Sequence, residues 1–169
     1  MNANTIRNLL EQKAGKLPKT RSNEELQSLA EFLEQPDTAD YLQHCVLDDV
    51  IAASGVRLLP INAIEQEMAE GAAPGSFIRP FGYLIVATSI GGNAVCIHSP
   101  TGKVFWADHT SFSDDSISYK DHASGEWKYL YEYTPANVEK ALVLLSNNME
   151  SFLVDLLSDR LTEKLDALD

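Results

Sequence analysis

Cysteine and long apolar runs are both scarce in this chain, and each absence excludes a class of protein. The two cysteines, Cys45 and Cys96, are too few for a disulfide framework, so we expect a reducing compartment. The longest apolar run, Tyr83 to Ala87, is far shorter than the roughly 18–20 residues that cross a bilayer. The N-terminus lacks the apolar core of a secretory signal. These observations predict a cytoplasmic protein without a membrane partner.

Positive charge is also scarce, and it is unevenly distributed. The chain has 13 lysines and arginines against 25 acidic residues, a net charge of −12. Residues 1–21 hold five basic groups and one acid, whereas the remaining residues hold eight basic and 24 acidic groups, a net charge of −16. Because phosphates need a basic face, this composition argues against a nucleic-acid partner. It favours a basic protein partner instead.

The motifs of common enzyme classes are missing as well. The sequence holds no GxSxG element, no HExxH pair, no EF-hand loop and no phosphate-binding loop. Potential metal ligands do gather in three pairs, Asp108-His109, Asp114-Asp115 and Asp121-His122. Their spacing matches no metal motif, so we predict a non-enzymatic protein without metal or cofactor. A metal-dependent hydrolase that uses Asp108, His109 and His122 stays open as an alternative.

Helical periodicity marks both ends of the chain. Apolar spacing predicts helices over residues 4–14, 22–36 and 37–54, the second of which starts with a capping box formed by Ser22 and Glu25. A strand over residues 56–61 and a short helix over 61–70 follow. At the other end, Thr134 and Pro135 start a helical stripe that extends to Leu168. Residues 146–148 are a weak point that could split this stripe in two.

The middle of the chain alternates short apolar runs with turns. Strands are predicted over residues 82–88, 94–98 and 103–107, joined by turns at residues 91–93 and 99–102. Residues 117–119 and 127–133 are further strand candidates. The sequence therefore predicts an α/β fold of the α+β type, with a central, mostly antiparallel sheet flanked by N- and C-terminal helices. Residues 1–36 form a helical segment and residues 37–169 the α/β domain of what we expect to be one compact domain.

The stretch from Phe81 to Phe112 has a distinctive order of elements. An apolar strand precedes the glycine turn Gly91-Gly92-Asn93. A later strand has the pattern of glycine, valine, aromatic residue, acid and histidine, formed by Gly102, Val104, Phe105, Trp106, Asp108 and His109. In these features the stretch is similar to the SUKH superfamily, which contains cell-wall-regulator-like and bacterial immunity domains. The resemblance implies an antiparallel sheet with flanking helices. It also implies a protein-binding role, typically the neutralisation of a bacterial toxin.

Several residues are candidates for partner contact: Trp106, Asp108, His109, Asp114, Asp115 and Asp121. Gly91, Gly92 and Gly102 are assigned to turns, where glycine supplies positive φ. For His109 the alternatives are a general base beside Asp108 and a hydrogen bond at the end of a strand. The aromatic residues are open between core packing and an exposed binding platform; they are Phe105, Trp106, Tyr129, Tyr131 and Tyr133.

We therefore predict an immunity protein whose acidic surface binds a basic toxin domain. A regulatory scaffold that binds a cellular protein is the second hypothesis, and the metal-dependent hydrolase is the third. The predicted protein is a monomer or a dimer, because the last turns of the C-terminal leucine stripe could dimerise.

Overall fold

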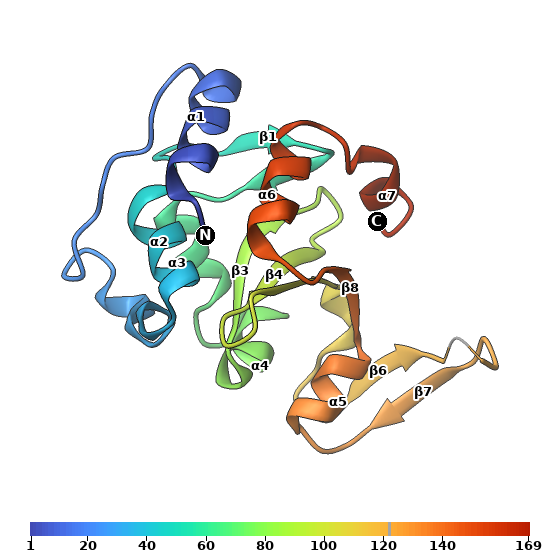
Figure 1. Cartoon of the computed structure of the whole chain (residues 1–169). Coiled ribbons are helices and arrows are strands. Elements are labelled where there is room, and N and C mark those ends of the chain that lie inside the picture. Colours follow the sequence, from blue (N-terminus) through green and yellow to red (C-terminus); the bar gives the residue numbers. More distant parts are fainter. Residues whose placement is uncertain (122) are drawn as a thin grey trace.

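Six antiparallel strands form the central sheet of the protein, in the order β1-β2-β3-β4-β5-β8, and β6 and β7 form a separate two-stranded sheet (Figure 1). The structure is a computed structural model that describes residues 1–121 and 123–169. Helices flank the sheet, which confirms the predicted α+β class. The strands are β1 (Ile51–Ala53), β2 (Val56–Leu58), β3 (Tyr83–Thr88), β4 (Ala94–His98), β5 (Lys103–Ala107), β6 (Ile117–Lys120), β7 (Trp127–Leu130) and β8 (Leu142–Ser146).

The strands β3, β4 and β5 form the centre of this sheet, and β4 and β5 have the boundaries predicted from the sequence. Every residue of β3 is buried, because helices cover the sheet there. Gly92, in the turn between β3 and β4, has a φ of +92°, which a residue with a side chain rarely adopts. Gly102, between β4 and β5, has a φ of +69°. These tight turns set an antiparallel register in which Val95 lies opposite Trp106.

The helical elements differ from the central strands in how well the sequence predicts their limits. The capping box of Ser22 and Glu25 is formed, since each side chain accepts a hydrogen bond from the backbone N–H of the other. It leads into a 3-10 helix rather than an α-helix. The elements are α1 (Ala3–Ala14), η1 (Gln27–Glu34), α2 (Pro36–His44), α3 (Ile61–Glu67), α4 (Gly75–Ile78), η2 (Arg79–Phe81), η3 (His109–Ser111), α5 (Pro135–Lys140), α6 (Met149–Leu157) and α7 (Thr162–Asp166).

The predicted helix over residues 37–54 is wrong in its second half. Helix α2 ends at His44, and the chain then forms the hairpin of β1 and β2. The turn of this hairpin contains Ser54 and Gly55, with φ values of +50° and +83°. Arg21 donates hydrogen bonds to the Val46 carbonyl and the Asp48 carboxylate, which holds this segment outside the helix. The positive φ of Gly55 therefore serves the turn of this hairpin.

The predicted C-terminal helical stripe is also wrong in part, because it contains a strand. Residues 142–146 form β8, which pairs with β5 at the edge of the sheet. The apolar run in this segment fits a helical stripe and a strand equally well. The predicted weak point coincides with the start of α6, where the Asn148 side chain accepts a hydrogen bond from the Ser151 N–H at 2.9 Å. Thr134 caps α5 in the same way.

The basic N-terminal residues fold onto the acidic remainder of the chain. Lys13 pairs with Asp159, Lys16 with Asp49, and both Lys19 and Arg21 with Asp48. Helix α1 packs against α6 and buries Ile6 and Leu10 in the core. The positive charge of residues 1–21 is therefore largely compensated within the molecule.

In the part of the chain that the structure describes, no helix is long and apolar enough to span a membrane.

Candidate functional site

The β6–β7 hairpin projects from the body of the molecule (Figure 1). Ile117 of β6 is fully buried and anchors the hairpin, and it forms an isolated bridge with Phe112. Tyr133, just after the hairpin, stacks on Phe77 with ring centroids 5.6 Å apart and donates a hydrogen bond to the Ser113 carbonyl at 2.7 Å. The base of the hairpin is therefore held firmly, whereas its strands extend away from the core.

Aromatic side chains lie exposed along β7 and just beyond it. The exposed fractions are 54% for Trp127, 59% for Tyr129 and 78% for Tyr131. Trp127 and Tyr129 are alternate residues of one strand, so they share a face of the hairpin. Ser118 and Lys120 lie opposite them on β6. Exposed tryptophan and tyrosine are the residue types that contribute most to protein interfaces, so this face is the candidate binding surface.

A cleft of about 150 Å³ lies between the hairpin and the start of β8. Trp106 and Leu142 contribute apolar surface from the sheet, and Trp127 contributes an aromatic wall from the hairpin. Lys120, Lys140 and Asp108 supply charge. The cleft is thus a mixed apolar and charged site that continues the exposed face of the hairpin.

Trp106, predicted as a contact residue, is almost fully buried. Its exposed fraction is 3%, and Phe105 beside it is also in the core. Helix α6 packs against β5, and residues of the hairpin and of the C-terminus lie beside Trp106 at the cleft. As a contact candidate, Trp106 is therefore restricted by its burial to the floor of the cleft. For the aromatic residues, the alternative of core packing holds in β5, at Phe105 and Trp106, and the alternative of exposure holds in β7, at Tyr129.

Asp108 and His109 have structural partners. The Asp108 carboxylate caps η3 by accepting hydrogen bonds from the Thr110 N–H at 2.8 Å and the Thr110 hydroxyl at 2.7 Å. His109 donates its backbone N–H to the Asn93 side-chain oxygen at 3.2 Å, and its Nδ1 lies 3.1 Å from the same atom. Asn93 in turn donates to the Asp169 carboxylate at 3.1 Å. His109 therefore forms a hydrogen bond at the end of a strand, and no nucleophile contacts its ring among the described residues.

The remaining acidic candidates lie at opposite ends of β6. Asp114 and Asp115 are exposed in the turn before β6, and neither carboxylate has a hydrogen-bond partner within residues 1–121 and 123–169. Asp121 follows β6 and pairs with Lys128 across the hairpin. Strand β6, four residues and about 13 Å long, lies between the two groups. The predicted acids therefore line the hairpin rather than form one compact cluster.

The hydrogen bond from Lys128 lowers the pKa of Asp121 to about 2, and the Ala123 N–H contributes in the same direction. The carboxylate is thus fully ionised at neutral pH and is bound by Lys128 and the Ala123 N–H in the hairpin. Its role in the structure is to close the hairpin, so that Asp114 and Asp115 are the acidic contact candidates after η3 without a salt bridge in the described chain.

Metal ligands and reactive thiols are two kinds of group from which catalytic centres are built. The described residues contain no group of three or more histidine, cysteine or acidic side chains that could hold a metal ion. His122, which the hydrolase hypothesis requires, lies outside the described residues. Burial raises the pKa of the Cys45 thiol to about 12 and raises that of Cys96 as well. Both thiols are therefore protonated at neutral pH and lack nucleophilic character.

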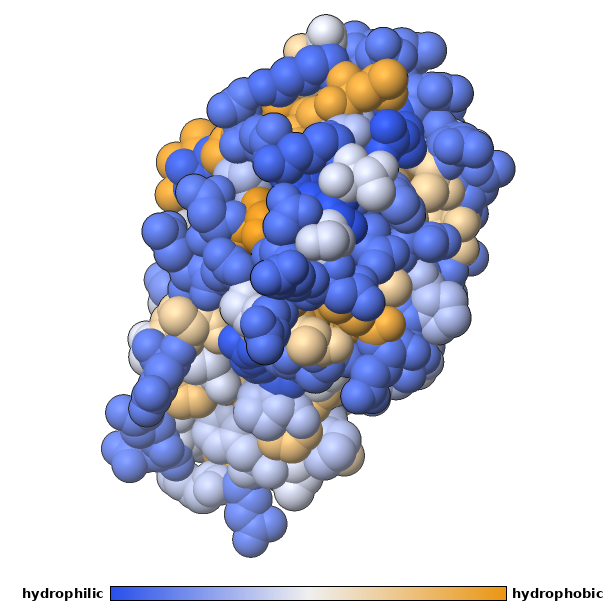
Figure 2. Space-filling model, turned by 90° about the vertical axis from the view of Figure 1, so that its left-hand side faces the viewer, coloured by the Kyte–Doolittle hydropathy of each residue, from blue (hydrophilic) through white to orange (hydrophobic). Residues whose placement is uncertain are grey.

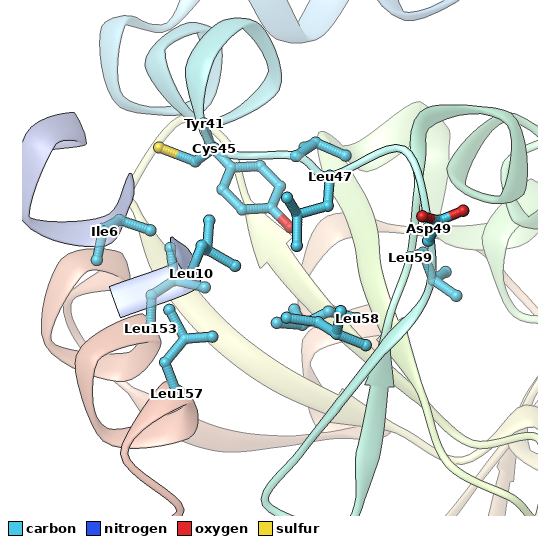
Figure 3. Close-up of a pocket in the computed structure, with 12 residues that line it drawn as sticks. Ile6, Leu10, Tyr41, Cys45, Leu47, Asp49, Leu58, Leu59, Leu153 and Leu157 are labelled. Carbon is cyan, nitrogen blue, oxygen red and sulfur yellow. The ribbon is translucent and has the colours of Figure 1, made fainter. Parts of the chain in front are cut away.

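A small, mostly apolar pocket lies among α1, α2, β2 and α6, but it is too small for a substrate. Figure 3 shows Tyr41 above this space, and the side chains on its two sides are Ile6, Leu10, Leu153 and Leu157 on one side and Leu58 and Leu59 on the other. Its volume is about 10 Å³, which is roughly the room needed by one water molecule. The cavity is a packing gap between the N-terminal helix and the sheet.

The face that includes the N-terminal segment is mostly hydrophilic, and hydrophobic residues appear there only as separate patches (Figure 2). This view offers no continuous apolar surface comparable to a protein interface.

Sequence reasoning missed three residues of the candidate site: Trp127, Lys120 and Lys140. The alternation of Trp127, Tyr129 and Tyr131 was visible in the sequence. The missing information was that these three side chains are not covered by the rest of the described chain. Without that knowledge an aromatic strand is indistinguishable from a core strand.

Comparison with known proteins provides no relative, since no protein-family model, curated protein or solved structure matches the chain.

Proposed function

We propose that this protein is a non-enzymatic binding module of the SUKH type, which binds a basic bacterial toxin through the exposed face of the β6–β7 hairpin. The observation that carries the proposal is the exposure of Trp127, Tyr129 and Tyr131 on a projecting hairpin. Aromatic residues with large exposed areas act as anchors that a partner buries. A fold without a binding role would gain nothing from leaving three such residues in water.

The charge of the same region supports a basic partner. Residues 112–134 contain five carboxylates and two lysines, and one of the lysines, Lys128, is already paired with Asp121. Asp114 and Asp115 lie exposed at the base of the hairpin. Opposite charge on the partner raises the rate of association more than the final affinity. The aromatic residues would then supply most of the binding energy.

The resemblance of residues 81–112 supports the choice of a toxin as the partner. An antiparallel sheet with flanking helices is the architecture that this resemblance implies, and the observed sheet agrees with it. In this proposal the protein acts in the cytoplasm and occludes the toxin by steric and electrostatic complementarity.

The proposal is tested by affinity capture from a lysate of the host at low salt, with quantitative mass spectrometry. The test variant is Tyr129→Ser combined with Tyr131→Ser. The matched control is Ile90→Ser, because Ile90 is 87% exposed in the turn between β3 and β4, away from the hairpin. Exposed substitutions change stability by only about 0.5 kcal/mol, so all three proteins should fold.

We expect the native protein and the control to capture the same basic toxin, and the tyrosine variant to capture at least about tenfold less of it. Equal capture by all three proteins would show that the hairpin is not the binding surface. Capture of an acidic partner, or of a cellular protein that is not a toxin, would reject the immunity function.

A further inference from the structure

We propose that the cleft between the β6–β7 hairpin and β8 binds a carboxylate attached to an apolar or aromatic group, presented by an extended segment of the protein partner. The partner's identity rests on the proposed function, whereas the chemistry of the cleft is argued from its own residues. The cleft has a volume of about 150 Å³, enough for one side chain rather than a folded element.

The cleft contains two positively charged side chains. Lys120 and Lys140 both line it, and neither forms a salt bridge in the described part of the chain. Most other basic groups do, including Lys13, Lys16 and Lys128. The chain has 25 acidic residues and 13 basic ones, so acidic groups of the protein itself outnumber the lysines and arginines that could pair with them. Two such lysines at one cleft therefore favour a negatively charged occupant.

The single acid of the cleft does not compensate these lysines. Asp108 uses its Oδ1 atom to accept hydrogen bonds from the Thr110 N–H and the Thr110 hydroxyl. Its carboxylate is therefore engaged in capping η3. The lining holds two ammonium groups and one carboxylate, a local net charge of +1 in a protein whose net charge is −12.

The apolar lining distinguishes the occupant from a simple anion. Trp106 and Leu142 are buried residues that reach the cleft from the sheet, and Val143 and Leu168 add aliphatic surface. Trp127 stands on the hairpin side with about half of its surface exposed. An inorganic anion would leave this surface in water, whereas an aromatic or aliphatic group beside the carboxylate would cover it. Charge and apolar surface together define an acidic, amphipathic ligand.

The inference is tested by NMR with ¹⁵N-labelled protein at low salt, observing the two indole N–H signals of Trp106 and Trp127. The probe is N-acetyl-phenylalanine with a free carboxylate. Its amide, N-acetyl-phenylalaninamide, is the matched neutral probe, and inorganic phosphate is the matched anion without apolar surface. We expect the acid to shift both indole signals saturably and the amide to bind about fivefold more weakly.

Two variants test whether the acid binds in the cleft. Lys140→Gln should weaken binding of the acid several-fold. Lys103→Gln should leave it unchanged, because Lys103 also has no salt bridge within the described residues but lies outside the cleft. Equal binding of acid and amide, equal shifts with phosphate, or no saturable shift would each overturn the inference. Movement of the indole signals with protein concentration alone would also overturn it, because a second copy would then occupy the cleft.

This titration uses no toxin, so its outcome is separate from that of the capture experiment. If the acid binds but the native protein captures no basic toxin, then the cleft stands and the proposed function fails. If the capture experiment succeeds and the acid does not bind, then the function stands and the cleft chemistry fails.

Discussion

The two tryptophans of this protein occupy strands of similar sequence pattern but opposite environments. Trp106 in β5 is 3% exposed, whereas Trp127 in β7 is 54% exposed. Strand β5 pairs with β4 on one side and β8 on the other, while β7 pairs only with β6. Side chains project from the faces of a sheet, so the difference arises from what packs on those faces: helix α6 contacts β5, whereas the β6–β7 hairpin projects from the body of the molecule. Residue type alone does not determine it.

This comparison divides the molecule into a region that stabilises the fold and a region that is free for recognition. The central sheet buries its aromatic residues and satisfies the turn between β3 and β4 through Asn93. The hairpin is anchored by Ile117 and Tyr133 at its base, but it leaves Trp127, Tyr129 and Tyr131 in contact with water. Substitutions should therefore separate stability from binding.

The largest expected effect is on the central sheet. Trp106→Ala should lower the free energy of unfolding by about 3–5 kcal/mol, because it leaves a cavity among buried residues. Trp127→Ala should change it by only about 0.5 kcal/mol. Urea denaturation followed by far-ultraviolet circular dichroism measures both without relying on tryptophan fluorescence. Similar losses for the two variants would contradict the proposed division of the molecule.

A smaller effect is expected at the turn between β3 and β4. Asn93→Ala removes the acceptor of the His109 N–H and the donor to Asp169. Because Asn93 is buried, its partners lose hydrogen bonds that water replaces poorly, and the free energy of unfolding should fall by about 1–3 kcal/mol. The same denaturation measurement checks this value. A change below the error of the measurement would show that this network does not hold the sheet and the C-terminal residues together.

The smallest effect concerns the hairpin and its dependence on pH. The pKa of Asp121 is lowered from 3.8 to about 2, so the folded hairpin favours the ionised carboxylate. Its contribution is complete above pH 4 and is lost as the pH falls towards 2. The carboxyl carbon of Asp121, followed by NMR, should titrate near pH 2, and Lys128→Gln should move this midpoint towards 3.8. A native midpoint near 3.8 would mean that the pair with Lys128 is absent.

Local sequence signals were sufficient for the central strands and for several helix ends. The limits of β4 and β5 follow from apolar runs between glycine turns, and the predicted caps at Ser22 and Thr134 are both formed. The errors occur where long-range pairing decides the structure. Residues 142–146 look helical in isolation, but they complete the edge of β5 as β8. Residues 51–53 become β1 only because β2 is available to pair with them.

The candidate site was less predictable than the fold, and for the same reason. The sequence identified the acidic and aromatic segment after β5, but it did not show which of its members are engaged internally. Asp108 caps η3, Asp121 pairs with Lys128, and His109 binds Asn93. The position of the hairpin against β8 determines two features of the site. It leaves the aromatic residues of β7 exposed, and it forms the cleft that Lys120 and Lys140 line. These relations are tertiary, and no local pattern encodes them.

The central claim, that the hairpin face is the binding surface, is tested most directly by site-specific photo-cross-linking in the host cell. Benzoyl-phenylalanine is placed at residue 129 on the hairpin, or at residue 90 in the turn between β3 and β4. The account predicts a covalent adduct with a basic protein from position 129 and none from position 90. Adducts from position 90 alone, or the same adduct from both positions, would contradict it.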